Sequence, residues 1–224
     1  MMTFKRTPYS FTFDQIKSSL KTGDILLFSR RDDQGLIDNI VYNARTKLLH
    51  NEYGHVGIIY RDDNGQLFVI EAVKPDQIAE DYAYYYKDAR KGGLRIIDMD
   101  TLMYRYSKEA QAEFGLMFIN KAIDNKLLTS NLDYYKNTTF RNGIIMTLLA
   151  FVDTAISNKQ ANWLAKHVYH KDRLMCSEFV YDILQRCGVV KPYTSSIFWP
   201  HLFTNGVFDK LAEGRYSECV KFVV

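Results

Sequence analysis

Two short apolar segments on either side of an Asp-Asp-Asn-Gly stretch constrain the fold of this chain more than any other feature of its sequence. Residues 56–60 and 67–73 are rich in β-branched and other apolar side chains, and the polar stretch between them is typical of a turn. The pattern predicts a β-hairpin with His55 at the start of its first strand and Glu71 inside its second. Polar side chains in such places are either satisfied core residues or parts of a site.

The length of the hairpin loop decides whether His55 and Glu71 can meet. Side chains alternate between the two faces of a strand, so a change of one residue in register turns every side chain to the other face. A two-residue turn at Asn64-Gly65 puts His55 and Glu71 on opposite faces, whereas a three-residue loop at 63–65, with Gly65 left-handed, puts them on the same face. Both loops suit this sequence, so the register stays open. A shared site requires the longer loop or a bulge elsewhere.

The rest of the pattern favours an α+β fold in a single domain, residues 1–224. No repeat, low-complexity tract or Pro/Gly/Ser-rich linker divides the chain. Hydrophobic periodicity predicts strands at 24–28 and 94–99 and helices at 13–20, 35–49, 108–124 and 176–187. We expect a small antiparallel sheet packed against the helix that begins at Cys176. A helical insertion at about 100–172 is expected between the sheet and that helix.

Composition and charge exclude some classes of protein. The formal net charge is +3, and no run of Lys and Arg forms a basic stripe, so we expect no nucleic-acid partner. The first residues contain no apolar stretch of the length that a signal peptide needs. The three cysteines, Cys176, Cys187 and Cys219, form no CxxC spacing, which favours a reducing compartment. We therefore expect a cytoplasmic protein.

The longest apolar segment, residues 143–151, is roughly half as long as the ~20 residues needed to cross a bilayer. A buried helix is the simpler interpretation of this segment. A weak contact with a membrane or lipid through the same residues stays open as the alternative.

Cys176 is the cysteine best placed for chemistry. It begins an amphipathic helix whose apolar stripe ends at Cys187 and Gly188. A helix N-terminus stabilises a thiolate through unpaired backbone N–H groups and the helix dipole, whereas Cys187 lies at the opposite end. The alternative is that Cys176 is a small buried hydrophobic residue, a common fate of cysteines that form no disulfide.

A nucleophilic cysteine also needs an imidazole and a group that orients the imidazole. His55 is the histidine best placed, at the end of a strand across which the cysteine helix could pack. Glu71 lies between apolar neighbours, where an ionised carboxylate needs a charged or hydrogen-bonding partner. An imidazolium on the neighbouring strand would serve, as would an arginine such as Arg45.

The sequence predicts neither a metal nor a cofactor. His50 with His55, or His167 with His170, could supply a pair of ligands, but no third and fourth ligand accompanies them at convincing spacing. Phosphate-binding glycine loops are absent, since the Gly-Gly pair at 92–93 fits a turn.

Four short motifs, taken in chain order, resemble one enzyme superfamily. They are Gly-Asp-Ile-Leu-Leu-Phe at 23–28, Gly-His-Val-Gly-Ile at 54–58, Val-Ile-Glu-Ala at 69–72 and Cys-Ser-Glu-Phe-Val at 176–180. Together they resemble the circularly permuted branch of the NlpC/P60 superfamily, closest to the YiiX/YaeF-like permuted papain-like enzymes. That branch is akin to the lecithin:retinol acyltransferase family. The resemblance does not extend over residues 100–172.

The resemblance implies a permuted papain-like fold and a catalytic triad. Cys176 would be the nucleophile, His55 the general base and acid, and Glu71 the group that orients His55. The backbone N–H of Cys176 would stabilise the oxyanion, with a second donor that the sequence does not assign.

The function expected from this resemblance is a cysteine-dependent hydrolase that forms a covalent acyl-enzyme. An amide bond in a small peptide or an amino-acid amide is the leading substrate. A lipid acyltransferase or thioesterase acting on an acyl substrate is the alternative from the same relatives. A non-catalytic binding domain on the same frame is a further alternative.

Overall fold

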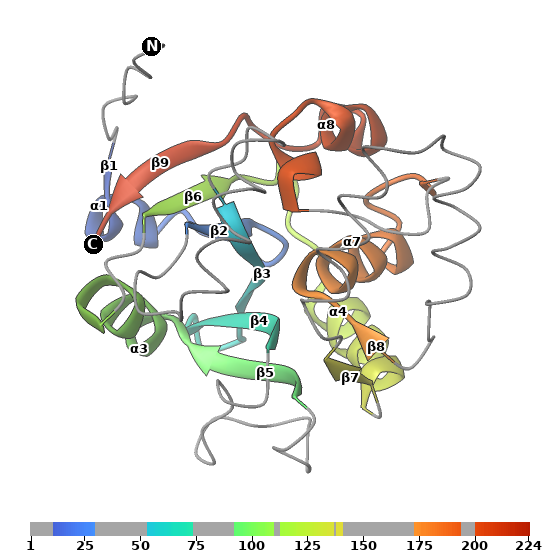
Figure 1. The fold of residues 1–224 in the computed structure, drawn as a ribbon, viewed down its shortest axis with the longest axis horizontal. Coiled ribbons are helices and arrows are strands. Elements are labelled where there is room, and N and C mark those ends of the chain that lie inside the picture. Colours follow the sequence, from blue (N-terminus) through green and yellow to red (C-terminus); the bar gives the residue numbers. More distant parts are fainter. Residues whose placement is uncertain are drawn as a thin grey trace, which may run out of the picture.

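A seven-stranded sheet forms the centre of the molecule (Figure 1). The computed structural model describes residues 11–29, 53–73, 92–109, 113–136, 138–140, 173–193 and 200–224. Neighbouring strands are antiparallel except for the parallel pair β1 and β9. The spatial order is β1 (Phe11–Thr12), β9 (Val220–Val223), β6 (Phe114–Met117), β2 (Ile25–Ser29), β3 (Tyr53–Arg61), β4 (Leu67–Val73) and β5 (Gly93–Asp98). The predicted α+β class is confirmed, and the sheet is larger than predicted.

The β3–β4 hairpin has the three-residue loop. Arg61 pairs with Leu67, and the Asp62 N–H donates to the Gln66 carbonyl at 2.9 Å, which leaves residues 63–65 in the loop. Gly65 has a φ of 84°, a left-handed conformation that glycine adopts without steric cost. The structure therefore selects the register that the sequence left open, in which the first and second strands present His55 and Glu71 on the same face.

The two faces of the sheet pack against different helices (Figure 1). The face named here the α7 face lies against α7 (Cys176–Arg186), α4 (Asn125–Leu132) and α8 (Val207–Ala212). The other, the α3 face, lies against α1 (Phe13–Lys17) and α3 (Met99–Tyr104). The α7 face includes Ile25, Leu27, Val56, Ile58, Ile70 and Ala72, and the α3 face includes Leu26, Phe28, Ile59, Leu67 and Val69. His55 and Glu71 alternate with residues of the α7 face, so their side chains belong to the α3 face.

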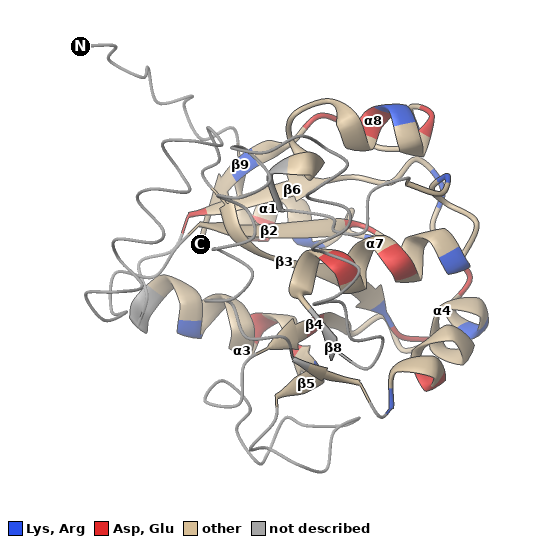
Figure 2. Cartoon of the chain, turned by 45° about the vertical axis from the view of Figure 1, so that its right-hand side comes forward, with Lys and Arg blue, Asp and Glu red and all other residues tan. Residues whose placement is uncertain are grey.

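Helix α7 begins at Cys176, as the sequence predicts. The backbone N–H of Met175 donates to Glu178 Oε2 at 2.9 Å, one half of a capping box that fixes the start of the helix. Gly188, with a φ of 69°, follows its C-terminal end. Acidic residues precede the basic residue at its last turn (Figure 2), an order that complements the helix dipole. The strands predicted at 24–28 and 94–99 and the helix at 13–20 are also present, with bounds that differ by a few residues.

The prediction of a helix at 108–124 is wrong. The helical segment ends with the π-helical turn η4 (Arg105–Glu109), and β6 then runs as an internal strand between β2 and β9. The four residues of β6 are all buried, so apolar and polar residues do not alternate along it. Hydrophobic periodicity therefore cannot distinguish this strand from a helix. A Cβ on Gly115 would lie 2.5 Å from the Tyr53 hydroxyl, so this strand needs glycine there. Residues 100–172 are therefore not a purely helical insertion.

The remaining described elements are short. They are the 3₁₀ turns η5 (Asp133–Tyr135) and η6 (Pro200–Phe203) and the parallel pair β7 (Thr139–Phe140) and β8 (Arg173–Leu174). The predicted helix at 35–49 and the apolar segment 143–151 lie outside the described residues. Within the described ranges, no helix has the length and apolar character needed to span a membrane.

Candidate active site

His55 and Glu71 meet on the α3 face. Glu71 Oε2 is hydrogen-bonded to His55 Nε2 across the two strands. The Glu71 side chain has no exposed surface, and that of His55 is 19% exposed. Gly57 lies between them on the same face, and a Cβ there would be 2.6 Å from Val69 Cγ1 and 3.5 Å from Glu71 Cβ. Glycine at 57 thus allows the close approach of β3 and β4 beside the pair.

The second oxygen of Glu71 contacts Arg95. Arg95 lies directly opposite Glu71 on β5, and its Nε donates to Glu71 Oε1 at 2.6 Å. Sequence reasoning missed this residue, although a basic side chain inside the apolar strand predicted at 94–99 was the available signal. Arg45, the arginine named as a partner from the sequence, lies outside the described residues.

The contacts of this cluster shift two pKa values. Burial opposes ionisation of Glu71, but the charges of Arg95 and His55 outweigh it and hold the pKa of Glu71 well below its usual range. Burial also opposes a charged imidazole, yet the negative charges of Cys176 and Glu71 raise the pKa of His55 above its usual value. Both shifts favour an ionised carboxylate beside an imidazolium.

Cys176 also reaches the imidazole. It is the first residue of α7, it is buried, and its side chain is hydrogen-bonded to His55. Helix α7 packs on the α7 face, and its first residue reaches the imidazole, which belongs to the α3 face. Glu71 occupies the Nε2 atom of His55, which leaves Nδ1 as the other ring nitrogen. The structure therefore brings all three predicted site residues together.

Aromatic side chains of the α3 face pack near the imidazole. The Phe28 ring centroid is 5.3 Å from that of His55 and 4.8 Å from that of Tyr106. Phe28 pairs with His55 on the neighbouring strand, so its ring lies on the same face. These contacts limit the rotation of the imidazole.

The other two cysteines lie in different surroundings. Cys187 follows the last residue of α7, and burial raises the pKa of its thiol to about 11. The Cys219 sulfur lies 3.6 Å from the Tyr53 hydroxyl. All three cysteines are among the described residues and are thiols. Among the described side chains, no three of His, Cys, Asp or Glu are grouped as metal ligands.

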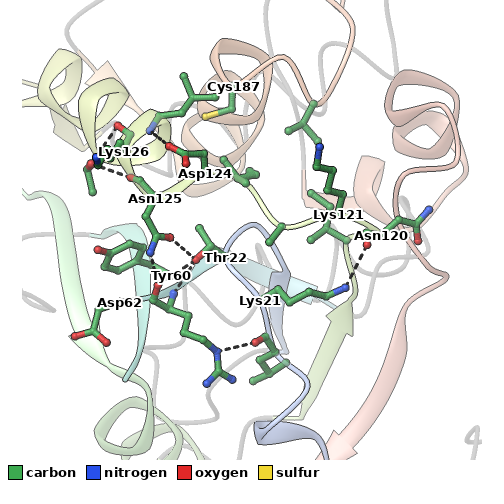
Figure 3. Close-up of a pocket in the computed structure, with 18 of the residues that line it drawn as sticks. Lys21, Thr22, Tyr60, Asp62, Asn120, Lys121, Asp124, Asn125, Lys126 and Cys187 are labelled. Atoms are coloured by element: carbon green, nitrogen blue, oxygen red, sulfur yellow. Dashed lines mark hydrogen bonds between the residues drawn. The ribbon is translucent and has the colours of Figure 1, made fainter. Parts of the chain in front are cut away.

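A cavity of about 1430 Å³ lies at the other end of β3, beside Tyr60 and Arg61 (Figure 3). Polar groups at its wall bond to one another: Thr22 Oγ1 donates to Asn125 Oδ1 at 2.8 Å, and Asn125 Nδ2 donates to the Arg61 carbonyl at 2.9 Å. Asp124 caps α4 at the same place. These groups fasten α4 to the end of the hairpin, away from His55.

The sequence of this chain is similar to that of a viral protein. No family model matches the sequence. The uncharacterized protein R372 of Acanthamoeba polyphaga mimivirus is 36% identical over 213 residues, which cover 94% of this chain and 85% of R372. This chain therefore belongs to the same protein family as R372.

Proposed function

We propose that this protein is a cysteine-dependent hydrolase in which Cys176 is the nucleophile, His55 the general base and acid, and Glu71 the group that orients His55. The observation that carries the proposal is the hydrogen-bonded series from Cys176 through His55 to Glu71. Three separate parts of the chain contribute to it: the first residue of a helix and one residue on each of two strands.

The proposed reaction has two steps. In the first, the Cys176 thiolate attacks the carbonyl carbon of an amide, and the C–N bond breaks as the His55 imidazolium gives its proton to the leaving amine. In the second, water attacks the carbonyl carbon of the thioester while His55 takes a proton from the water, and the C–S bond breaks to release the acid and the Cys176 thiolate. Glu71 stays ionised and stabilises the imidazolium.

The backbone at the start of α7 supports the same chemistry. The first N–H groups of a helix have no helical acceptor, and they stabilise negative charge. We assign the backbone N–H of Cys176 to the oxyanion formed in each step.

The order of these elements also supports membership of the circularly permuted NlpC/P60 superfamily, in its YiiX/YaeF-like branch. The histidine strand precedes the strand of the acidic residue, and both precede the cysteine helix. We propose an amide bond in a small peptide or an amino-acid amide as the substrate. A reducing compartment such as the cytoplasm would keep Cys176 as a thiol.

The lipid alternative rests on the acyltransferase relatives and on residues 143–151. Those residues lie outside the described ones, so the amide substrate is retained as the leading proposal. A binding domain without catalysis would leave the contact between Cys176 and His55 without a role.

Trapping the acyl-enzyme tests the proposal. The protein is mixed with p-nitrophenyl esters and p-nitroanilides of N-acetylated amino acids, quenched in acid and analysed by peptide mass spectrometry. We expect the acyl group on Cys176, its absence in Cys176→Ala and a loss of about 100-fold or more in rate in His55→Ala. Cys187→Ala is the matched control and should keep the rate. Acylation that is absent, or spread over several side chains and independent of His55, would contradict a hydrolase and favour the binding domain.

A further inference from the structure

Arg95 is a buried cation with a fixed orientation. Its side chain is 5% exposed, and its Nε donates to Glu71 Oε1 at 2.6 Å. The same guanidinium is hydrogen-bonded to the side chain of Tyr106. A guanidinium carries its donors in one rigid plane, so two partners determine how it lies.

The contacts of Arg95 lead back to the imidazole. Tyr106 belongs to the π-helical turn η4, and π-helical turns are frequent at functional sites. Its ring contacts Phe28, and Phe28 contacts His55. Glu71, Arg95, Tyr106 and Phe28 thus form a closed set of contacts with His55. A change at Arg95 is transmitted to the imidazole by two routes.

A permanent charge beside Glu71 matters because His55 changes its own charge. In each step of the proposed reaction His55 is neutral for part of the cycle, and a fully buried carboxylate would then have no charged partner without Arg95. A guanidinium stays protonated throughout the accessible pH range, so it keeps Glu71 ionised in both states of His55.

We propose that Arg95 is a positioning residue of the active site, which fixes Glu71 through Oε1 so that Oε2 holds His55 toward Cys176. This inference rests on the proposed function. Arg95 does not contact the reacting atoms in this proposal, and it acts on the imidazole only through Glu71 and through Tyr106.

Two substitutions separate the charge of Arg95 from its packing. Arg95→Met keeps an apolar side chain of similar length without the charge, and Arg95→Lys keeps the charge without the planar donors. Arg186→Met is the matched control, because Arg186 forms an ion pair with Asp182 at the far end of α7. Circular dichroism and thermal unfolding establish that each variant folds.

The first measurement is the titration of the Glu71 carboxyl, followed by ¹³C NMR with labelled glutamate and assigned from Glu71→Gln. We expect Arg95→Met to raise the pKa of Glu71 by about 1 to 3 units, because loss of a close opposite charge has that effect. Arg95→Lys and Arg186→Met should stay close to the wild type. The second measurement is the rate of Cys176 alkylation by iodoacetamide against pH. The acid limb of this profile should move to higher pH in Arg95→Met, and at a pH below both midpoints a shift of one unit lowers the thiolate fraction, and with it the rate, about tenfold.

The two measurements distinguish a failure of the proposed function from a failure of the inference about Arg95. If wild-type Cys176 reacts like an ordinary thiol, the proposed function fails and the role of Arg95 in it falls too. If wild-type Cys176 is activated but Arg95→Met leaves the Glu71 titration unchanged, the inference about Arg95 alone is overturned. Equal effects of Arg95→Met and Arg95→Lys on both profiles would show that the charge of Arg95 does not keep Glu71 ionised, and would likewise overturn the inference.

Discussion

Glu71 has no contact with solvent, and each of its two carboxylate oxygens faces a different nitrogen. A carboxylate in that position is stable only because Arg95 and His55 replace the water that it has lost. Its ionisation is therefore linked to the folded state, and the free energy of unfolding must depend on pH through this one group.

Glu71→Gln should reveal this linkage. The pKa of Glu71 is lowered to about 2 in the folded protein. Its contribution to the free energy of unfolding is therefore fully present above the ordinary carboxyl pKa and is lost as pH falls from about 5 toward 2. The contribution lost over that range is about 3 kcal/mol. Urea unfolding of wild type and Glu71→Gln at about pH 7 and pH 3 measures it, and the difference between them should narrow in acid.

The exposed Glu213, which pairs with Lys191, supplies the control. Glu213→Gln should change the free energy of unfolding little at either pH, because exposed ion pairs contribute little. A Glu71→Gln difference that is the same at both pH values would contradict the account of Glu71 as an ionised carboxylate.

At the scale of elements, the loop at 63–65 determines which side chains share a face. The Asp62 carboxylate accepts from the N–H groups of Asn64 and Gln66 at 3.0 Å and 2.7 Å, which holds the three-residue form. Gly65 completes it with a left-handed backbone. The pairing of His55 with Glu71 therefore depends on a loop that contacts neither of them.

Gly65→Ala and Gly65→Asn test this loop. A Cβ at 65 has open space, with Arg61 Nη1 as its nearest contact at 3.9 Å, so the cost of a side chain comes from the backbone conformation. We expect Gly65→Ala to lower the free energy of unfolding by roughly 1 to 2 kcal/mol, and Gly65→Asn by less, because asparagine tolerates the left-handed region. Chemical unfolding measures both. An alanine variant as stable as the wild type would show that the loop does not need this conformation.

The sequence predicted the elements that local patterns determine. Alternation and turn residues located the hairpin, and a helical stripe that ends at Gly188 located α7. Local patterns could not predict pairing between distant segments. Residues 114–117 form a strand because β2 and β9 pair with them on either side, and the local periodicity of hydrophobic residues carries no information about such partners. Arg95 was missed for the same reason, since the register that sets it opposite Glu71 joins two strands without a short turn between them.

At the scale of the whole molecule, the candidate site joins segments that are far apart in the chain. Helix α7 comes last of the three, and its contacts with β3 and β4 place Cys176 beside residues of the hairpin. The proposed chemistry therefore depends on the correct packing of α7 against β3 and β4.

The activation of Cys176 by His55 is tested most directly by the pH dependence of Cys176 alkylation by iodoacetamide, in a Cys187→Ser/Cys219→Ser background with and without His55→Ala. We expect a fast reaction that persists well below pH ~8, where an ordinary thiol is mostly protonated, and that is lost with His55→Ala. A Cys176 that titrates as an ordinary or buried thiol, whether or not His55 is present, would contradict it.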